Sequence, residues 1–224
     1  MTRITPEKIL PHAMPVVLLT GFDPFGGDAV NPSWLAAQAL HDEDIEGHRI
    51  VAAQLPTTFA GSRLMLLKLL RQHKPALVVC VGLAGGRPAL SLERVAINIQ
   101  DARIADNAGQ QPVDVPVTQR GPPAYFSTLP IKAMQHSLTA AGVAAEVSQT
   151  AGTFVCNHVF YVLMHALKKQ RSSNTRGGFV HVPYVPGQGV PCMPLDQIVR
   201  GLRLAVACAL VTEQDALIGA GALN

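Results

Sequence analysis

The sequence is poor in charge and in aromatic residues. Charged residues make up 15% and aromatic residues 5% of its 224 positions, and the formal net charge is only +3. Lys and Arg never run longer than a pair, whereas a dedicated nucleic-acid binder carries a dense basic patch. We therefore expect no nucleic-acid partner.

Long hydrophobic runs are missing as well. No apolar stretch approaches the roughly 18 residues that indicate a membrane span. The first 15 residues are interrupted by charges and prolines, so they lack the apolar segment of a signal peptide. The sequence predicts a cytoplasmic protein without membrane contact, with a tail over residues 1–14 and a single domain over 15–224.

Cysteine is scarce, with four residues at Cys80, Cys156, Cys192 and Cys208. None of them forms a CxxC pair, which excludes the common zinc and redox motifs. In a chain without a secretion signal, these residues are expected to be free thiols in a reducing compartment.

What the sequence has is apolar material, at 48% of its residues, in alternating strand-like and helical segments. This alternation predicts a single-domain three-layer α/β/α sandwich with a mixed, largely parallel central sheet. A polar excursion rich in Pro and Gly is expected over residues 100–126. The predicted strands are 16–20, 49–54, 76–82, 91–99, 144–150 and GFVHVPYVP; the predicted helices are Pro32 to about Leu40, 59–72, 127–141, one ending near Lys169, and 195–213.

In such folds, ligands bind at the carboxyl ends of the strands. Cys156 follows a strand and the turn AGTF, at the start of a predicted helix. Free N–H groups and the helix dipole stabilise a thiolate at that position, which makes Cys156 a candidate nucleophile. A buried cysteine is more often a small hydrophobe, and this interpretation applies to Cys80 and Cys208. Cys192, in a loop flanked by prolines, is expected to be exposed and chemically incidental.

A thiol nucleophile needs a base, usually histidine. His158 is two residues past Cys156, about 200° around the helix, and His165 is about 13 Å along it, so neither reaches the sulfur. His181 lies in an apolar strand, where an imidazole needs a hydrogen-bond partner. It is either a satisfied core histidine or the base for Cys156, and the residues alone favour neither.

A third group should orient the imidazole. Glu93 follows the glycine-rich turn GLAGGR inside an apolar strand, and its alternative role is a surface ion pair with Arg94. Asp101 and Asp106 are rival carboxylates. Arg103 is either a cation near a developing oxyanion or a salt-bridge partner.

The loop GFDPFGG places Phe22 and Phe25 three residues apart. They either line a small apolar pocket or simply pack within the loop. Neither GFDPFGG nor GLAGGR has the Lys-Ser/Thr of a P-loop or the full GxGxxG spacing, so a phosphate cradle is not indicated.

Two longer stretches point to a known family. The segments GLAGGRPALSLERVAIN, around Glu93, and VSQTAGTFVCNHVFY, around Cys156, resemble those of pyroglutamyl peptidase I, a family of cysteine peptidases. The resemblance extends from TGFDPFGGDAVNPS to PYVPGQ. It implies a catalytic triad of Cys156, His181 and Glu93.

The resemblance further implies removal of an N-terminal pyroglutamyl (5-oxoproline) residue from peptides through a thioester. It also implies a homotetramer and no metal or cofactor. The implied substrate-binding residues are the ring-binding aromatics and the positions lining or supporting their pocket, with one cation near the nucleophile: Phe22, Phe25, Asn31, Phe154, Val155 and Arg103.

The chain departs from the family pattern at two places. Leu83 stands where many members have Gln. The loop after Pro186 is shorter, with Gly187 and Cys192 in place of Glu and Ser. Two other functions are open on the same fold: a nucleoside phosphorylase-like enzyme and a non-catalytic binder of small lactams. Only a peptidase loses turnover when Cys156 is blocked.

Overall fold

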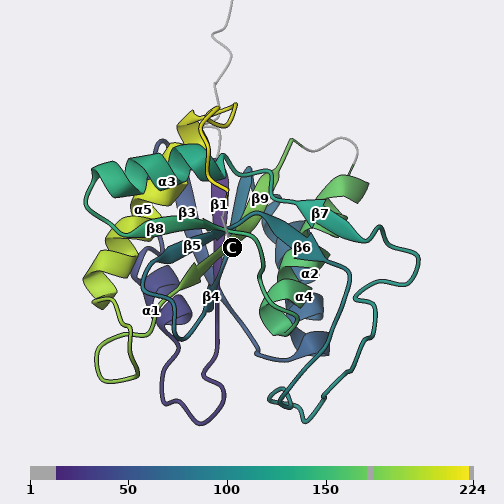
Figure 1. Ribbon diagram of the computed structural model, residues 1–224. Helices are drawn as coiled ribbons and strands as arrows, with labels where there is room; N and C mark the ends of the chain where they lie inside the picture. Colours follow the sequence, from purple (N-terminus) through teal and green to yellow (C-terminus); the bar gives the residue numbers. More distant parts are fainter. Residues whose placement is uncertain (1–13, 171–173, 222–224) are drawn as a thin grey trace, which may run out of the picture.

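A seven-stranded sheet runs through the middle of the molecule, in the order β2-β3-β1-β4-β9-β5-β8 (Figure 1). The computed structural model describes residues 14–170 and 174–221, so the predicted tail lies outside it except for Met14. The pairs β1–β3, β1–β4, β4–β9 and β5–β8 are parallel, and β2–β3 and β5–β9 are antiparallel. The strands are β1 (Val16–Phe22), β2 (Asp44–Ile45), β3 (His48–Leu55), β4 (Leu77–Leu83), β5 (Leu90–Glu93), β8 (Ala145–Ser148) and β9 (Arg176–Val182).

Helices cover both faces of the sheet, which confirms the predicted three-layer fold with a mixed, largely parallel sheet. One face is covered by α1 (Pro32–Ala39), α3 (Ile131–Ala140) and α5 (Leu195–Val211), and the other by α2 (Phe59–His73) and α4 (Val155–Lys169) (Figure 1). None of the helices in the described part of the chain is long and apolar enough to span a membrane.

The apolar strands build a separate core on each face. In β4, Val79 and Val81 belong to the core under α1 and α5, whereas Val78 and Cys80 belong to the core under α2 and α4. A strand that is covered on both sides needs apolar residues at every position, which explains its unbroken run. The predicted burial of Cys80 and exposure of Cys192 are confirmed, whereas Cys208, which was expected to be buried, is half-buried.

The structure corrects the predicted single strand over 91–99. The chain leaves the main sheet after Glu93, and β6 (Val95–Ile97) pairs instead with β7 (Ala124–Phe126) in a two-stranded sheet. The imperfect alternation of this segment reflects two strands in different sheets. The polar segment predicted over 100–126 therefore ends in β7, which pairs with β6.

Two predicted helix boundaries also need correction. The helix expected over 127–141 begins at Ile131, because the N–H and hydroxyl of Thr128 make three hydrogen bonds with the backbone of Gly177 and Pro130 is the N-cap. The last helix ends at Val211 and not at 213, since Thr212 is already extended.

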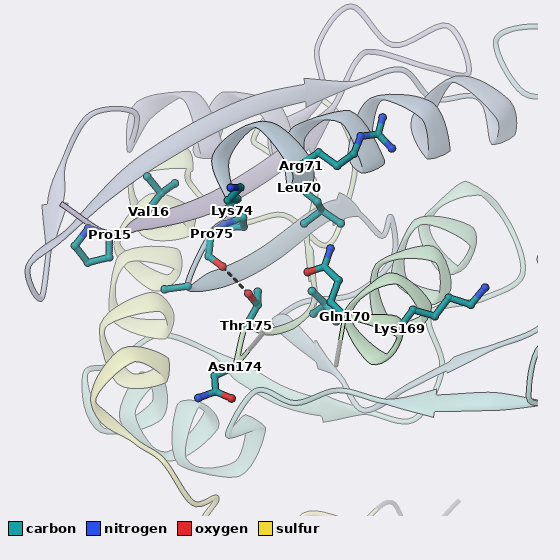
Figure 2. A pocket seen from close by; sticks show the side chains of 12 residues that line it. Pro15, Val16, Leu70, Arg71, Lys74, Pro75, Lys169, Gln170, Asn174 and Thr175 are labelled. Atoms are coloured by element: carbon teal, nitrogen blue, oxygen red, sulfur yellow. Dashed lines mark hydrogen bonds between the residues drawn. The ribbon is translucent and has the colours of Figure 1, made fainter. Parts of the chain in front are cut away.

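A cavity of about 940 Å³ lies where β1, β4 and β9 begin (Figure 2). Its walls combine apolar residues such as Leu70 with the cations Arg71, Lys74 and Lys169. No cysteine, histidine or carboxylate is among the described residues that line it. The pocket that contains Cys156 and His181 is smaller and lies at the opposite ends of the same strands.

Candidate active site

A pocket of about 210 Å³ opens at the carboxyl ends of β1, β4 and β9, where a ligand site is expected. β1 contributes its last residue, Phe22, and β4 contributes Leu83. Seven of the nine site residues proposed from the sequence line this pocket: Phe22, Phe25, Asn31, Phe154, Val155, Cys156 and His181.

Cys156 is the second residue of α4. The side chain of the N-cap residue, Phe154, cannot accept a hydrogen bond. The N–H groups of the first helical turn therefore lack a capping side chain among the described residues. Asn157 fixes the start of the helix, because its side chain accepts from Ile97 N and donates to the carbonyls of Ile97 and Ile99. The sulfur is thus presented at the positive end of an anchored helix.

Gly82 brings the sulfur close to the sheet. A Cβ atom at this residue would lie 2.8 Å from Cys156 Sγ, a distance that real Cβ contacts do not show. Gly82 is in register with His181 on the neighbouring strand β9, so the two residues share one face of the sheet. The glycine therefore allows Cys156 to pack beside His181, although no hydrogen bond joins their side chains in the described structure.

His181 has a buried carboxylate as its partner. Its Nδ1 lies 2.7 Å from Oε1 of Glu93, whose side chain is 0% exposed. In the antiparallel pair β5–β9, Ser91 is opposite His181 and Glu93 is opposite Phe179. Glu93 is thus the diagonal neighbour of His181, within reach of a long side chain.

This contact fixes the tautomer of the imidazole. An ionised carboxylate only accepts hydrogen bonds, so the Nδ1 of His181 carries the proton. The other nitrogen, Nε2, is then the basic atom. The alternative partner for Glu93 is excluded, because the guanidinium of Arg94 bonds to Gln149 Oε1 and to the carbonyl of Ala220.

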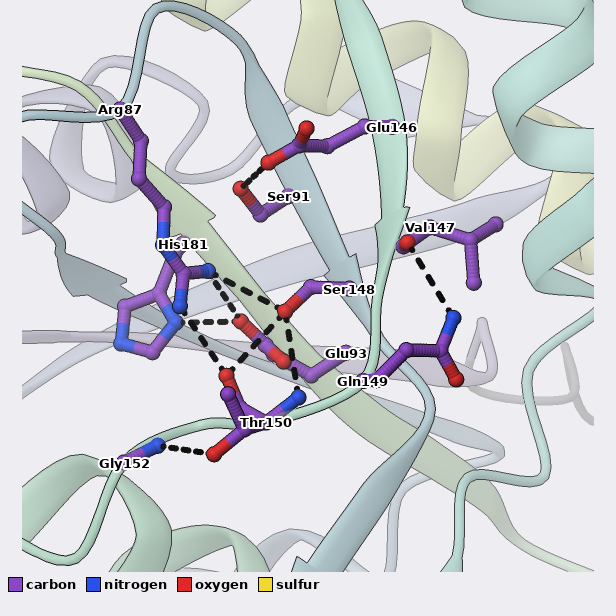
Figure 3. A network of polar contacts seen from close by, with 10 residues as sticks. All are labelled: Arg87, Ser91, Glu93, Glu146, Val147, Ser148, Gln149, Thr150, Gly152 and His181. Atoms are coloured by element: carbon purple, nitrogen blue, oxygen red, sulfur yellow. Dashed lines mark hydrogen bonds and ion pairs between the residues drawn. The ribbon is translucent and has the colours of Figure 1, made fainter. Parts of the chain in front are cut away.

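Arg87 belongs to the site, although the sequence reasoning missed it. Its guanidinium donates to Glu93 Oε1 at 2.7 Å and to the Thr150 carbonyl at 3.0 Å, and it lines the pocket (Figure 3). Its position in the sequence could have indicated this role. Arg87 lies in a glycine-rich turn directly after a central strand, and such turns lie at the ligand-binding edge of the sheet.

The rival residues lie elsewhere. Asp101 is exposed, and Asp106 is buried but accepts from the backbone N–H groups of Phe59, Ala108 and Gln110, which gives it a structural role. Arg103 is exposed and is not among the described residues that line the pocket. The cation that the structure brings to the nucleophile's pocket is Arg87.

Aromatic rings form one wall of the pocket. The rings of Phe25 and Phe154 have centroids 6.1 Å apart, and Phe59 meets Phe154 edge-on at 5.5 Å. Asn31 shapes the loop that carries Phe25, because its Nδ2 donates to the Asp23 carbonyl and its Oδ1 accepts from Ser33.

The sequence predicts a stabilised thiolate at Cys156, but burial of the sulfur in the pocket opposes this and favours the protonated thiol. Burial raises the pKa of the Cys156 thiol to about 12; the charge of Glu93 also raises it, and Arg87 opposes the effect. Deprotonation therefore needs a base close by. His158 does not serve, because it packs edge-on against Phe59 and burial lowers its pKa to about 4. No group of three metal-ligating side chains occurs in residues 14–170 and 174–221.

A cysteine at a helix start, beside a histidine bonded to a buried carboxylate, defines the site of a cysteine-type hydrolase. The family model "Pyroglutamyl peptidase" matches residues 15–212. The chain belongs to the pyroglutamyl peptidase family.

Relatives and solved structures agree with this assignment. The chain is 54% identical to pyrrolidone-carboxylate peptidase 1 of Ralstonia nicotianae over 94% of this chain and 100% of the relative. It is 45% identical to the crystal structure of pyroglutamyl peptidase I from Bacillus amyloliquefaciens (TM-score 0.89, covering 92% and 100% of the two chains). The pyrrolidone carboxyl peptidase of Thermococcus litoralis is 36% identical, with a TM-score of 0.84 over 88% and 94%. None of these matches supports the phosphorylase-like or lactam-binder alternative.

The contact between Gly82 and Cys156 predicts a site-specific effect of one methyl group. In Gly82→Ala, the new Cβ must displace the sulfur or the ring of Phe179, which it would also meet at 2.8 Å. We expect turnover to fall about 100-fold, the cost of misplacing a reacting group by about 1 Å. Gly177→Ala is the matched control, because the nearest neighbours of its Cβ are Leu167, Leu163 and a backbone oxygen of β4, at 3.0–3.2 Å, and none of them belongs to the site. Activity is measured by steady-state kinetics and stability by thermal unfolding. Equal losses of activity in the two variants would contradict a site-specific effect at Gly82.

The raised pKa of Cys156, about 12, predicts how its alkylation depends on pH. Only the thiolate reacts, so the iodoacetamide rate at Cys156 should rise by about tenfold per pH unit from pH 7 to pH 9. Peptide mapping by mass spectrometry separates Cys156 from the exposed Cys192. A rate that is independent of pH below pH 7 would instead reveal a thiolate already paired with an imidazolium.

Proposed function

We propose that this protein is an exopeptidase that removes an N-terminal pyroglutamyl residue from peptides through a thioester at Cys156. The observation that carries the proposal is a cysteine beside a His181–Glu93 pair in a pocket just large enough for a small ring. Family membership supports the same substrate, because the named relatives are pyrrolidone-carboxylate and pyroglutamyl peptidases.

The chemistry begins with transfer of a proton. Nε2 of His181 takes the thiol proton of Cys156 while Sγ bonds to the carbonyl carbon of the pyroglutamyl residue. This concerted step suits a thiol of raised pKa, because no free thiolate has to form in the buried pocket. Glu93 stabilises the imidazolium that results.

The developing oxyanion needs hydrogen-bond donors. The uncapped N–H groups of the first turn of α4, with that of Cys156 among them, support this role. We do not assign it to Arg103, because that residue is exposed and outside the pocket.

The second half of the reaction reverses the proton transfers. His181 gives its proton to the nitrogen of the leaving peptide as the C–N bond breaks, which leaves the thioester. A water molecule then attacks the thioester carbonyl and loses a proton to His181. The proton returns to Sγ as the C–S bond breaks, and pyroglutamic acid is released.

The pocket also explains why a blocked N-terminus is preferred. Phe22, Phe25 and Phe154 offer apolar faces to a flat lactam ring that carries no charge. No carboxylate is among the described residues that line the pocket, so a free ammonium group would find no anionic partner there. An ordinary proline or glutamate N-terminus would have to bury its positive charge unpaired.

We also propose an assembly of four identical subunits in the cytoplasm. Exposed apolar side chains support contacts between subunits, for instance Val113 and Phe126, which are 66% and 69% exposed. A light-scattering mass equal to one or two 23.8 kDa chains would contradict the tetramer.

The direct test uses hydrolysis of a pyroglutamyl-amide reporter, with a prolyl-amide reporter as the control substrate. We expect the wild type to cleave only the pyroglutamyl reporter. Cys156→Ala should lose several orders of magnitude in turnover while it remains folded and binds pyroglutamate. Cys192→Ala, which changes an exposed thiol away from the pocket, should retain full activity. Substantial turnover by Cys156→Ala would refute the assignment.

Leu83 offers a test of substrate affinity. It lines the pocket at the end of β4, where many family members have Gln. Leu83→Gln adds one polar contact to the lactam, so KM should fall by an amount equivalent to about 0.5–1.5 kcal/mol, with little change in kcat. The opposite result, an unchanged or raised KM in steady-state kinetics, would mean that the added amide finds no partner in this pocket.

A further inference from the structure

Arg87 and His181 bond to the same oxygen of the buried carboxylate. Oε1 of Glu93 lies 2.7 Å from Nδ1 of His181 and 2.7 Å from Nη1 of Arg87, whereas the buried Oε2 has no partner among the described residues. Figure 3 shows the guanidinium of Arg87 and the imidazole of His181 both pointing toward this carboxylate. The carboxylate thus stabilises two cations when His181 is protonated, and one when it is neutral.

A buried carboxylate needs compensation of its charge. An uncompensated charge that is removed from water is strongly unfavourable. The guanidinium of Arg87 remains charged at every pH of interest, so it compensates Glu93 whether or not His181 carries its second proton. The buried imidazole of His181 can then gain and lose its second proton without leaving Glu93 as an isolated buried anion.

Arg87 also ties two loops of the site together. Its Nη2 donates to the carbonyl of Thr150 and its Nη1 is 3.3 Å from Ser148 Oγ. Thr150 leads directly to Ala151 and Gly152, which line the pocket ahead of Cys156. One planar group therefore holds the base's carboxylate and the segment that carries the nucleophile in a fixed relation.

We propose that Arg87 is a positioning residue for the reaction: its guanidinium clamps Glu93 to the loop before Cys156 and sets the charge balance of the His181–Glu93 pair. The proposal rests on the proposed peptidase function. It adds a fourth residue, supplied by the β4–β5 turn, to the three named from the sequence.

The charged and titratable groups around His181 come from several elements. Glu93 on β5 bonds to it, Arg87 in the β4–β5 turn shares that carboxylate, and Cys156 on α4 lines the same pocket. Cys80 lies on the neighbouring strand β4, and Glu146 on β8 bonds to Ser91, the residue opposite His181. Glu146 is exposed and bonds to Ser91, so water screens it. Arg87 is the only permanent cation of this group.

The test compares Arg87→Gln and Arg87→Lys with Arg94→Gln. Arg94 is the matched control, because it bonds to Gln149 on the same loop but not to Glu93. In Arg87→Gln, kcat on the pyroglutamyl reporter should fall roughly 10- to 100-fold with little change in KM. The acid limb of the kcat/KM profile should move up by about one pH unit, because the less compensated carboxylate retains the imidazolium. Arg94→Gln should change neither quantity.

Arg87→Lys separates charge from geometry. It keeps the positive charge but loses the planar fork, so the acid limb should return to its wild-type position while part of the loss in kcat remains. An unmoved acid limb with unchanged kcat in Arg87→Gln would overturn the proposal, as would equal effects in Arg94→Gln. If Arg87→Gln does not fold, a fully active Arg87→Lys variant overturns the clamp, and a reduced kcat supports it.

A measurement without substrate separates this proposal from the peptidase assignment. Arg87 lowers the pKa of Cys156, so Arg87→Gln should slow alkylation of Cys156 at pH 8 by about tenfold, and Arg94→Gln should not. A wild type that fails to cleave the reporter counts against the peptidase function alone. Unchanged alkylation in Arg87→Gln counts against the role of Arg87 alone.

Discussion

The buried carboxylate of Glu93 is the interaction on which the site depends. It lies at 0% exposure, between the imidazole of His181 and the guanidinium of Arg87, and both bond to one oxygen. This contact fixes which nitrogen of His181 is basic, and it provides the charge that an imidazolium needs. Without it, the protonated thiol of Cys156 would face a ring of undefined orientation. The rest of the fold brings these groups to one edge of the sheet.

That convergence comes from strand register and from one missing side chain. His181 is in register with Gly82 on one neighbouring strand and with Ser91 on the other. Cys156 Sγ packs close to Gly82, in space that a Cβ atom at this residue would need. Asn157 anchors the start of α4 to the backbone at the end of β6 and just beyond it, which holds the neighbouring Cys156 in place. Backbone geometry therefore positions all three reacting side chains, which explains why few polar residues are needed around them.

Much of this arrangement was accessible from the sequence. Long apolar runs such as 76–82 predicted the buried strands, and Asn31-Pro32 predicted the start of α1. Predictions from hydrophobic periodicity were wrong where tertiary contacts determine the structure. The segment 91–99 forms two strands because β6 pairs with β7, and α3 begins later than predicted because Thr128 bonds to Gly177. The sequence did not identify Arg87 as a site residue, and Arg103, which it did propose, does not line the pocket. The direction of a side chain in a loop depends on the backbone conformation of the turn, which cannot be derived from the spacing of residues.

The most direct measurement is the turnover of Glu93→Gln with the pyroglutamyl reporter, compared with His181→Ala. The amide keeps the size of the carboxylate and can still orient the ring, but it cannot stabilise the imidazolium. We predict a loss of at least about 100-fold in kcat for Glu93→Gln, smaller than that of His181→Ala, with the fold intact. A Glu93→Gln enzyme with wild-type kcat would contradict the account, because the charge of the buried carboxylate would then play no part in the reaction.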